Sequence, residues 1–254
     1  MDIIMISCTD VSVGYGARTI IEHIGFTANP SEITILLGRN GCGKSTLMRA
    51  LVGNLRHHGR IEIDGSELSE LSPTERARRL SLMPQLMARP GISVRELVSF
   101  GRQPYSGFGG ILSSRDHELV DKALSDAGIS GLSEAPANRL SGGELQKAYL
   151  ALVLAQDTPN LLLDEPCAHL DAAYERRIAD FLRSAKAAGK TVLAVYHDLS
   201  RAVELADRLL VIDRGRLVFD GDPGRFISED IAGGYFGLQT YRCPDAAGDR
   251  IFFR

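Results

Sequence analysis

A glycine-rich stretch, Gly38–Thr46 (GRNGCGKST), has the residue types and spacing needed to bind the phosphates of a nucleotide. Its glycines allow backbone conformations in which successive amide groups point at anionic oxygens. Lys44 would reach the β- and γ-phosphates as a point charge, and the Ser45 hydroxyl is placed to ligate Mg²⁺. The apolar run Ile33–Leu37 before it predicts a buried strand, and Leu47–Val52 after it predicts a helix. Because this motif requires that context, we predict a nucleotide-binding loop rather than a chance glycine-rich turn.

Two consecutive carboxylates, Asp164 and Glu165, follow the apolar strand pattern Leu161–Leu163. In a doubly wound sheet, ligands bind at the carboxyl ends of the strands. Neighbouring side chains on a strand point in opposite directions, so one carboxylate is expected on the Mg²⁺ shell and the other toward the attacking water. His197 follows another predicted core strand, Thr191–Tyr196, and ends beside the same loops. A structural and a catalytic role for this histidine both remain open at this point.

The stretch Leu140–Glu144 (LSGGE) predicts a second anion site. Ser141 and Glu144 have the spacing of a capping box that opens the apolar helix Leu145–Ala155. Two glycines in a first helical turn cost about 1 kcal/mol each, which suggests that something approaches this backbone closely. An exposed helix start with free amides and a serine hydroxyl can bind an anion.

Strand patterns dominate the first 85 residues, and helical patterns dominate from about Ile92 to Ala155. Tyr15 lies between two glycines in a predicted turn, where it is either a turn residue or a platform for a base. The expected elements are two antiparallel strands within residues 3–26, a strand at Arg60–Asp64, a helix at Pro73–Arg79 capped by Ser72, a strand at Leu80–Met83, and helices at Ser93–Arg102, Ser114–Ala127 and from Asp171 to Ala187.

A Gly/Pro/aromatic loop at residues 101–110 joins two of the expected helices. It is either disordered or a docking surface. Arg102, Tyr105 and Phe108 are the side chains expected to be exposed there as anchors for a partner.

Composition excludes several classes of protein. The 254 residues are 44% hydrophobic and 24% charged, as in a soluble globular protein. The net charge of -3 gives no drive toward nucleic acid or anionic lipid. No apolar run approaches the roughly 20 residues of a membrane span, and the first residues lack a basic signal region. Four cysteines without a C-x-x-C pair indicate reduced thiols, with neither a disulfide framework nor a zinc site.

Taken in chain order, these motifs resemble those of the ATP-binding subunit of ABC transporters. The resemblance covers nearly the whole chain. Its segments are Gly38–Thr46, Gln85, Leu140–Glu144, Leu161–Glu165, Leu170–Asp171 and His197. The combination of LSGGE with the phosphate loop and the acidic strand is highly specific, so other classes of phosphate-loop NTPase become remote.

The resemblance implies a role for each of these residues. Glu165 is the implied general base, with His197 and Gln85 as the other catalytic residues. The implied cofactors are ATP and Mg²⁺, the metal being held by Ser45, Gln85 and Asp164. Tyr15 would stack on adenine. Ser141, Gly142 and Gly143 would bind the γ-phosphate of the ATP held by a second protomer. The other residues implied to bind ATP are Gly38, Asn40, Gly41, Cys42, Gly43, Lys44, Ser45, Thr46 and Asp171.

The resemblance also implies the fold class, which is α/β. It predicts a RecA-like phosphate-loop NTPase core with an antiparallel β subdomain and an inserted α-helical subdomain. A single ABC ATPase domain would span residues 1–254, with the core at 1–85 and 156–222, the helical subdomain at 86–155 and a short C-terminal extension at 223–254. Two anion sites on one chain are best used by a head-to-tail homodimer that sandwiches two ATP molecules.

Four sequence features resemble those of the subfamily that powers uptake of ferric siderophores, haem and cobalamin. They are Met83-Pro84-Gln85, Cys42 in the phosphate loop, the segment Gly101–Tyr105 and the short C-terminal tail. The implied partners are integral-membrane permease subunits and, indirectly, a periplasmic or surface substrate-binding protein, with no nucleic acid. The implied location is peripheral, on the cytoplasmic side of the cell's inner membrane. Cys167-Ala168-His169 departs from the family's more frequent Thr-Ser or Thr-Ala, so fine contacts between protomers stay open.

Two other functions compete with import. A soluble ABC ATPase of iron-sulfur cluster assembly would also lack a membrane span, and sedimentation with membranes only when a permease is co-expressed separates the two. ABC proteins of DNA repair or translation carry coiled-coil inserts or two cassettes, and this chain has neither.

Overall fold

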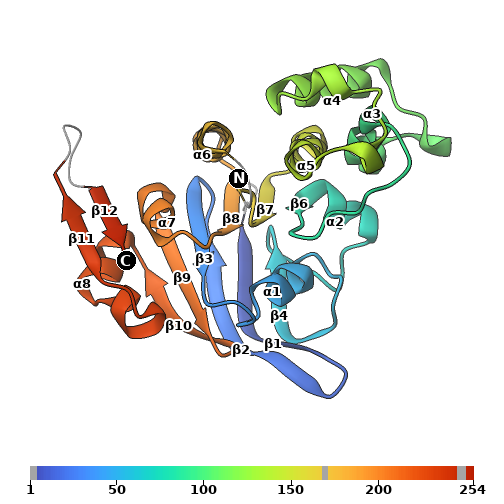
Figure 1. Ribbon diagram of the computed structural model, residues 1–254. Coiled ribbons are helices and arrows are strands. Elements are labelled where there is room, and N and C mark those ends of the chain that lie inside the picture. The colour runs from blue at the N-terminus through green and yellow to red at the C-terminus, as the bar shows by residue number, and fades with distance from the viewer. Residues whose placement is uncertain (1–4, 168–170, 245–249) are drawn as a thin grey trace.

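A six-stranded sheet forms the centre of the molecule in a computed structural model that describes residues 5–167, 171–244 and 250–254. Five strands are parallel and β10 is antiparallel to its neighbour. Figure 1 shows the sheet with helices beside it. The strand order is β10 (Arg216–Gly221), β9 (Arg208–Asp213), β3 (Glu32–Leu37), β8 (Thr191–Val195), β7 (Asn160–Asp164) and β6 (Leu80–Met83).

The central strand β3 shows why the parallel strands are apolar along their whole length. Its alternate residues Ile33, Ile35 and Leu37 are buried in one apolar cluster with the helices that follow in the chain. Leu36 points the other way, into a second cluster shared with α1 (Lys44–Leu51) and the antiparallel strands. Both faces of the sheet are therefore covered, so this strand does not show the alternation of polar and apolar residues that is typical of a half-exposed strand.

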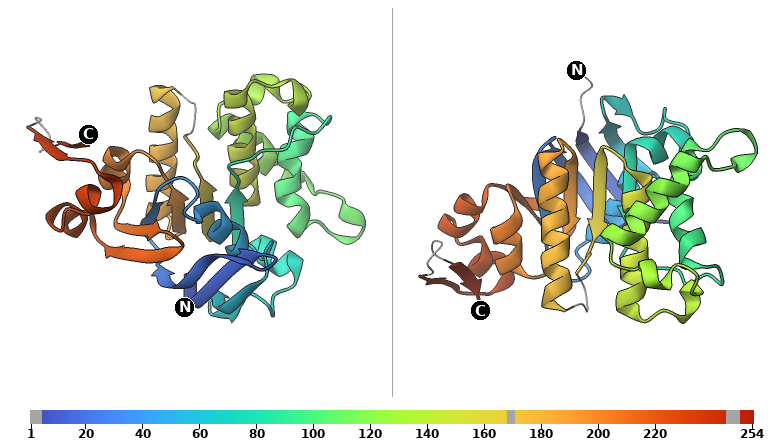
Figure 2. Two further views of the ribbon diagram at one scale, coloured as in Figure 1. Left: turned by 60° about the horizontal axis from the view of Figure 1, so that its bottom comes forward. Right: turned by 90° about the horizontal axis from the view of Figure 1, so that it is seen from above.

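A second, antiparallel sheet covers one side of α1. Its strands occur in the order β2 (Arg18–Ala28), β1 (Ile6–Tyr15), β4 (His57–Ile63) and β5 (Ser66–Glu67). Figure 2 shows β1 and β2 along one edge of the molecule, with the short helix α2 (Pro73–Arg79) following β5 in the chain. The expected capping box at the start of α2 is present, with the Ser72 hydroxyl accepting from the Glu75 amide.

Between β6 and β7 the chain forms a group of helices that lies to one side of the sheet (Figure 1). In chain order they are α3 (Val94–Ser99), η1 (Phe100–Tyr105), η2 (Phe108–Gly110), α4 (Ser114–Asp126), η3 (Ser130–Leu132), η4 (Ala137–Arg139) and α5 (Gly142–Gln156). The predicted helix Ser93–Arg102 is too long, because α3 ends at Ser99 and a 3₁₀ helix follows. The chain packs tightly on α5 there, since a Cβ on Gly101 would lie 2.6 Å from the Leu152 carbonyl oxygen.

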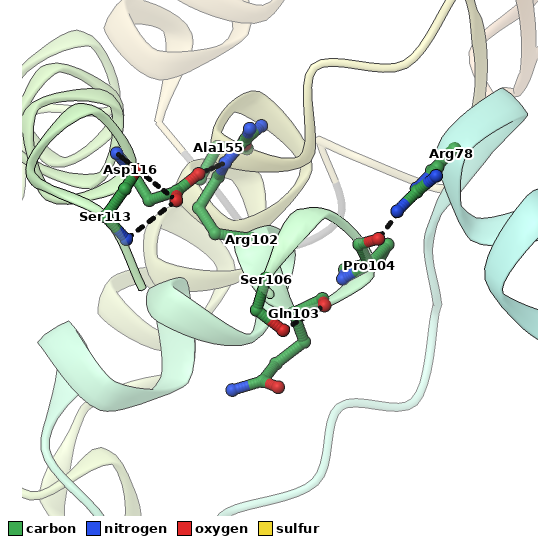
Figure 3. Close-up of polar contacts among 8 residues, drawn as sticks. All are labelled: Arg78, Arg102, Gln103, Pro104, Ser106, Ser113, Asp116 and Ala155. Atoms are coloured by element: carbon green, nitrogen blue, oxygen red, sulfur yellow. Dashed lines mark hydrogen bonds and ion pairs between the residues drawn. The ribbon is translucent and has the colours of Figure 1, made fainter. Parts of the chain in front are cut away.

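Arg102 is buried, so the prediction that it is an exposed docking anchor is wrong. Its Nε donates to Asp116 Oδ1 at 2.9 Å, and its Nη1 donates to the Ala155 carbonyl at 2.8 Å. The guanidinium also lies 4.0 Å from the centre of the Tyr105 ring, which is half-buried. Figure 3 shows these bonds joining the η1 segment to the start of α4 and the end of α5. The side chain of Phe108, the third expected anchor, lies outside the described residues.

Toward the C-terminus the chain forms the expected helix α6 (Ala172–Ala187), followed by helices and a hairpin that the sequence did not predict. The unpredicted elements are α7 (Leu199–Leu205), α8 (Pro223–Ser228), the π-helix η5 (Ala232–Phe236), β11 (Thr240–Cys243) and β12 (Arg250–Phe253). The two strands pair antiparallel, and Phe253 packs edge-on against Phe226 with ring centres 5.9 Å apart. Among the described residues, no helix has both the length and the apolar character required to cross a membrane.

Candidate functional site

The candidate site is the edge of the large sheet where four parallel strands end. β3, β8, β7 and β6 are neighbours, so their carboxyl ends meet there. At or within two residues of these ends lie Gly38, His197, Asp164 with Glu165, and Gln85. The sheet thus brings together residues from four separate parts of the sequence.

The phosphate loop requires glycine at specific points. Gly43 has φ +112°, and a Cβ there would lie 2.4 Å from Ile21 Cδ1. Gly38 has φ +154°, and its Cβ would lie 2.3 Å from the Ile212 carbonyl oxygen. Larger residues are therefore excluded both by backbone conformation and by contact.

The loop leads directly into the N-terminus of α1. Gly43 is the N-cap, it supplies no side-chain cap, and no acidic residue lies in the first turn. The amides at this end are therefore free to face an anion, which the helix dipole also favours. Lys44 is buried at 6% exposure, and its Nζ donates to the Gly38 carbonyl at 2.7 Å and to the Arg39 carbonyl at 3.3 Å. The loop thus holds an ammonium group next to its own backbone.

Three oxygen-bearing side chains meet beside Lys44. Ser45 Oγ lies 3.5 Å from Gln85 Oε1. Asp164 is 4% exposed and its Oδ1 has no hydrogen-bond partner among the described residues. Burial raises the pKa of the Asp164 carboxyl, and hydrogen bonding to Ser45 partly opposes that rise. Mg²⁺ prefers oxygen ligands. This cluster supplies three oxygen-bearing side chains, and one carboxylate oxygen of Asp164 is buried and unpaired among the described residues, so the cluster suits Mg²⁺.

Glu165 and His197 form a pair beside this oxygen cluster. Glu165 Oε1 lies 2.5 Å from His197 Nε2, and the Glu165 side chain is only 11% exposed. Glu165 has φ +57°, a left-handed conformation that is uncommon for a residue with a side chain. Asp164 belongs to β7 and Glu165 to the turn after it, so the two carboxylates are directed to different places.

Tyr15 lies next to α1. Its hydroxyl is 3.4 Å from Arg49 Nη1, and the side chain is exposed at 46%. The hydrogen bond from Arg49 lowers the pKa of the Tyr15 hydroxyl. This placement leaves an aromatic ring open to solvent beside the helix that follows the phosphate loop.

The LSGGE residues lie elsewhere in the chain. Ser141 is the N-cap of α5 in the expected capping box: its Oγ accepts from the Glu144 amide at 3.3 Å, and Glu144 Oε2 accepts from the Ser141 amide at 2.8 Å. Figure 1 shows α5 grouped with α3 and α4, apart from α1. Gly142 is exposed, and among the residues that the structure describes a Cβ on it would meet nothing within 4 Å. The packing of this chain therefore does not require a glycine there.

The other predicted binding residues have simple local positions. Asn40 and Gly41 are exposed on the phosphate loop, whereas Cys42 and Thr46 are buried under it. Asp171 is the N-cap of α6, where its Oδ1 accepts from the Tyr174 amide at 2.8 Å, as the helix prediction expected. Ala168, His169 and Leu170, part of the departure from the family pattern, lie outside the described residues.

Two residues that contact this region were missed by sequence reasoning. Gln146 is buried on α5, and its Nε2 donates to the Glu165 carbonyl at 3.3 Å and the Pro166 carbonyl at 3.1 Å. Arg89 Nη1 donates to the Leu140 carbonyl at 2.6 Å. A glutamine inside an almost wholly apolar helix was the available signal for the first. Arg89 gave no signal, because its partner lies 51 positions away.

Comparisons with known proteins agree with this arrangement. The family model described as ABC transporter matches residues 21–168, more than half of the chain. The chain is 35% identical to the achromobactin transport ATP-binding protein of Dickeya dadantii (strain 3937), over 94% of this chain and 90% of that protein. It is 35% identical to the ferric enterobactin transport ATP-binding protein of Escherichia coli (strain K12), over 92% of this chain and 88% of that protein.

A third relative and two solved structures extend the comparison. The hemin import ATP-binding protein of Nocardia farcinica (strain IFM 10152) is 38% identical over 85% of this chain and 75% of that protein. A structure of an ABC transporter in an inward-facing conformation has a TM-score of 0.83 at 24% identity, over 100% of this chain and 97% of that one. A nucleotide-free ATP-binding cassette from an ABC transporter has a TM-score of 0.78 at 21% identity, over 91% of this chain and 96% of that one. The two structures show that the fold is shared.

Proposed function

This chain belongs to the ABC transporter family as an ATPase, and from that premise we propose that it drives import of an iron chelate through a membrane permease. The observation that carries the ATPase part of this proposal is the pairing of two anion sites on one chain, whereas the cargo is proposed from the relatives. One is the phosphate loop with Asp164, Glu165 and His197 at the sheet edge, and the other is the start of α5.

The phosphate loop would bind ATP with its backbone amides and Lys44. The Lys44 ammonium would exchange its bonds to loop carbonyls for bonds to the β- and γ-phosphates. Ser45, Gln85 and the unpaired oxygen of Asp164 would hold Mg²⁺. The metal ion would neutralise phosphate charge in the transition state. Tyr15 would contact the adenine ring, since its ring is exposed beside α1.

Glu165 would act as general base for the attacking water. It needs a fixed orientation, and the 2.5 Å contact with His197 supplies one. His197 would also hold the γ-phosphate, while Gln85 would position the water near the metal. The remaining predicted contacts, Asn40 and Asp171, are exposed as an interface would require.

A head-to-tail dimer would use both anion sites. Ser141, Gly142 and Gly143 of one protomer would face the γ-phosphate bound by the other. The support is that Gly142 is exposed and that no other part of the described chain lies within 4 Å of where a Cβ would be. A glycine there leaves room for a neighbouring molecule.

The relatives support a proposal for the cargo and the partners. The relatives named above are described as transporting achromobactin and ferric enterobactin and as importing hemin. We propose a ferric siderophore for this chain, with haem and then cobalamin as alternatives. The homodimer would lie peripherally on the cytoplasmic side of the inner membrane, beneath two permease subunits that receive cargo from a periplasmic or surface binding protein.

The helical group at residues 86–155 would be the subdomain that contacts the permease, with the core at 1–85 and 156–222 and the C-terminal extension at 223–254. Affinity purification of the tagged protein from membranes, followed by mass spectrometry, tests this assignment. Recovery of an integral-membrane permease supports it. Recovery of iron-sulfur assembly proteins without any permease would reject it.

A further inference from the structure

Gln146 connects two parts of the proposed site that are distant in sequence. It lies on α5, is 7% exposed, and its side-chain amide donates to the backbone carbonyls of Glu165 and Pro166. Both carbonyls belong to the turn that carries the proposed base. The contact therefore acts on the backbone of Glu165, while His197 contacts its carboxylate.

The turn after β7 needs such support. Glu165 has φ +57°, and a non-glycine residue keeps this conformation only when its surroundings determine it. Pro166 has no amide hydrogen and cannot close a turn by donating a hydrogen bond. The Gln146 donor is therefore one of the contacts that hold this peptide segment in place.

The same helix begins with the second anion site. Ser141 is the N-cap of α5 and Gln146 lies five residues later, which corresponds to about 7.5 Å along a helix axis. Between them Glu144 completes the capping box, so two hydrogen bonds between side chain and backbone stabilise the first turn of α5. A change in the position of the helix start is thus transmitted to Gln146 with little loss.

We infer that Gln146 is a positioning residue, which ties the orientation of Glu165 in one active site to the position of the α5 start at the other. This inference rests on the proposed function, because it requires Glu165 as the base and Ser141 at the partner's nucleotide. Binding of the partner's phosphate at Ser141 would fix α5, and Gln146 would then fix the turn that carries Glu165.

Two further hydrogen bonds connect α5 and the chain just before it to the segment that follows Gln85. Tyr149 Oη donates to the Ala88 carbonyl at 3.0 Å, and Arg89 donates to the carbonyl of Leu140, just before the helix. The first half of α5 is therefore hydrogen-bonded to the backbone beside the proposed base and to the segment that follows Gln85.

The same helix offers a matched control. Gln156, at the other end of α5, also donates from Nε2 to two backbone carbonyls, those of Ala77 at 2.6 Å and Leu80 at 3.1 Å. It is partly buried, and in the described structure these bonds go to neither Glu165 nor Pro166. Replacing either glutamine with methionine removes two similar bonds, but only the change at Gln146 affects the turn of the base.

The test measures ATPase kinetics, unfolding in urea and ATP-dependent dimer formation for full-length Gln146→Met, Gln146→Glu and Gln156→Met proteins. We expect both Gln146 variants to lose kcat on the order of 10-fold to 100-fold, with KM for ATP changed by less than about 3-fold. An ATP-bound dimer should accumulate in them, because binding is intact and hydrolysis is slow. Gln156→Met should show a urea midpoint shift comparable to that of Gln146→Met and a normal kcat.

A normal kcat in the folded Gln146 variants would overturn the inference, and so would an equal loss of kcat in Gln156→Met. Gln146→Glu keeps the shape of the side chain but not its donor, so it tests the hydrogen bonds separately if the methionine variant does not fold. Failure of the proposed function looks different, because wild-type protein would then lack ATPase activity or Glu165→Gln would hydrolyse ATP normally.

Discussion

Arg102→Met removes the guanidinium group from a buried ion pair and keeps an unbranched side chain. The Arg102 and Asp116 side chains are each 9% exposed. After the change, Asp116 Oδ2 keeps its bonds from the Ser113 amide at 3.0 Å and the Ser113 hydroxyl at 2.6 Å. Its Oδ1 and the Ala155 carbonyl each lose the bond that Arg102 donated.

Removing one partner of a buried ion pair costs about 3–5 kcal/mol, and a carbonyl left unpaired adds about 1 kcal/mol. The two remaining Ser113 bonds reduce the first figure, so we expect a total loss of about 3–4 kcal/mol. In a chain of this size that corresponds to a Tm roughly 10 °C lower. Urea unfolding followed by circular dichroism measures the change in free energy.

Arg95→Met is the matched control. Arg95 also contacts two carboxylates, Asp121 at 2.7 Å and Glu134 at 3.2 Å, but its side chain is 38% exposed. An exposed pair contributes about 0–1 kcal/mol. If Arg102→Met and Arg95→Met differ by less than about 1 kcal/mol, the reasoning from burial is refuted. If Arg102→Met had normal stability but no longer bound the permease, Arg102 would be the docking anchor expected from the sequence.

Three more changes test the site and its surroundings. Glu165→Gln should keep ATP binding but lower hydrolysis by roughly 10²-fold or more, because the base is lost, and size-exclusion with Mg-ATP should show a stable dimer; normal hydrolysis contradicts the assignment. Ser141→Arg should abolish turnover with near-normal ATP binding to the monomer, and mixing it with Lys44→Ala protein should restore about one working site per mixed dimer. No recovery in proven mixed dimers would remove support for the head-to-tail arrangement. Hydrogen bonding from Ser113 holds the folded-state pKa of Asp116 at about 2, below its ordinary 3.8. The ionised Asp116 carboxylate therefore stabilises the folded protein fully above pH 3.8, and this stabilisation is lost as the pH falls toward 2. Between pH 5 and pH 3 the urea midpoint should fall less in Asp116→Asn than in wild type. An equal fall of the urea midpoint in both proteins refutes this.

Local patterns in the sequence were sufficient to predict much of the fold. The apolar run before Gly38, the capping box at Ser141 and the strand that ends at Asp164 each depend on residues within a few positions. These predictions hold in the folded protein because they depend on contacts between residues that are close in the sequence. The same patterns placed four site segments at strand ends, and the parallel pairing of those strands brings them together.

Contacts between distant segments were not predictable. The sequence shows Arg102 in a Gly/Pro-rich stretch, which favours exposure, but its partner Asp116 lies 14 residues away across a loop. Gln146 contacts carbonyls 19 and 20 positions later, and only the packing of α5 against the end of β7 creates that contact. The C-terminal hairpin was missed because its strands are short and partly exposed, so their alternation is weak.

Uptake of labelled ferric siderophore by cells that lack this protein tests the proposed import function most directly. The deletion strain receives plasmid copies of wild type or Glu165→Gln, and labelled ferric siderophore, haem and cobalamin are supplied in turn. We expect siderophore uptake to fall to background and to return with wild type but not with Glu165→Gln. Loss of haem or cobalamin uptake alone would move the cargo to that compound. Unchanged uptake of all three, in a strain without a redundant system, would contradict the proposed function.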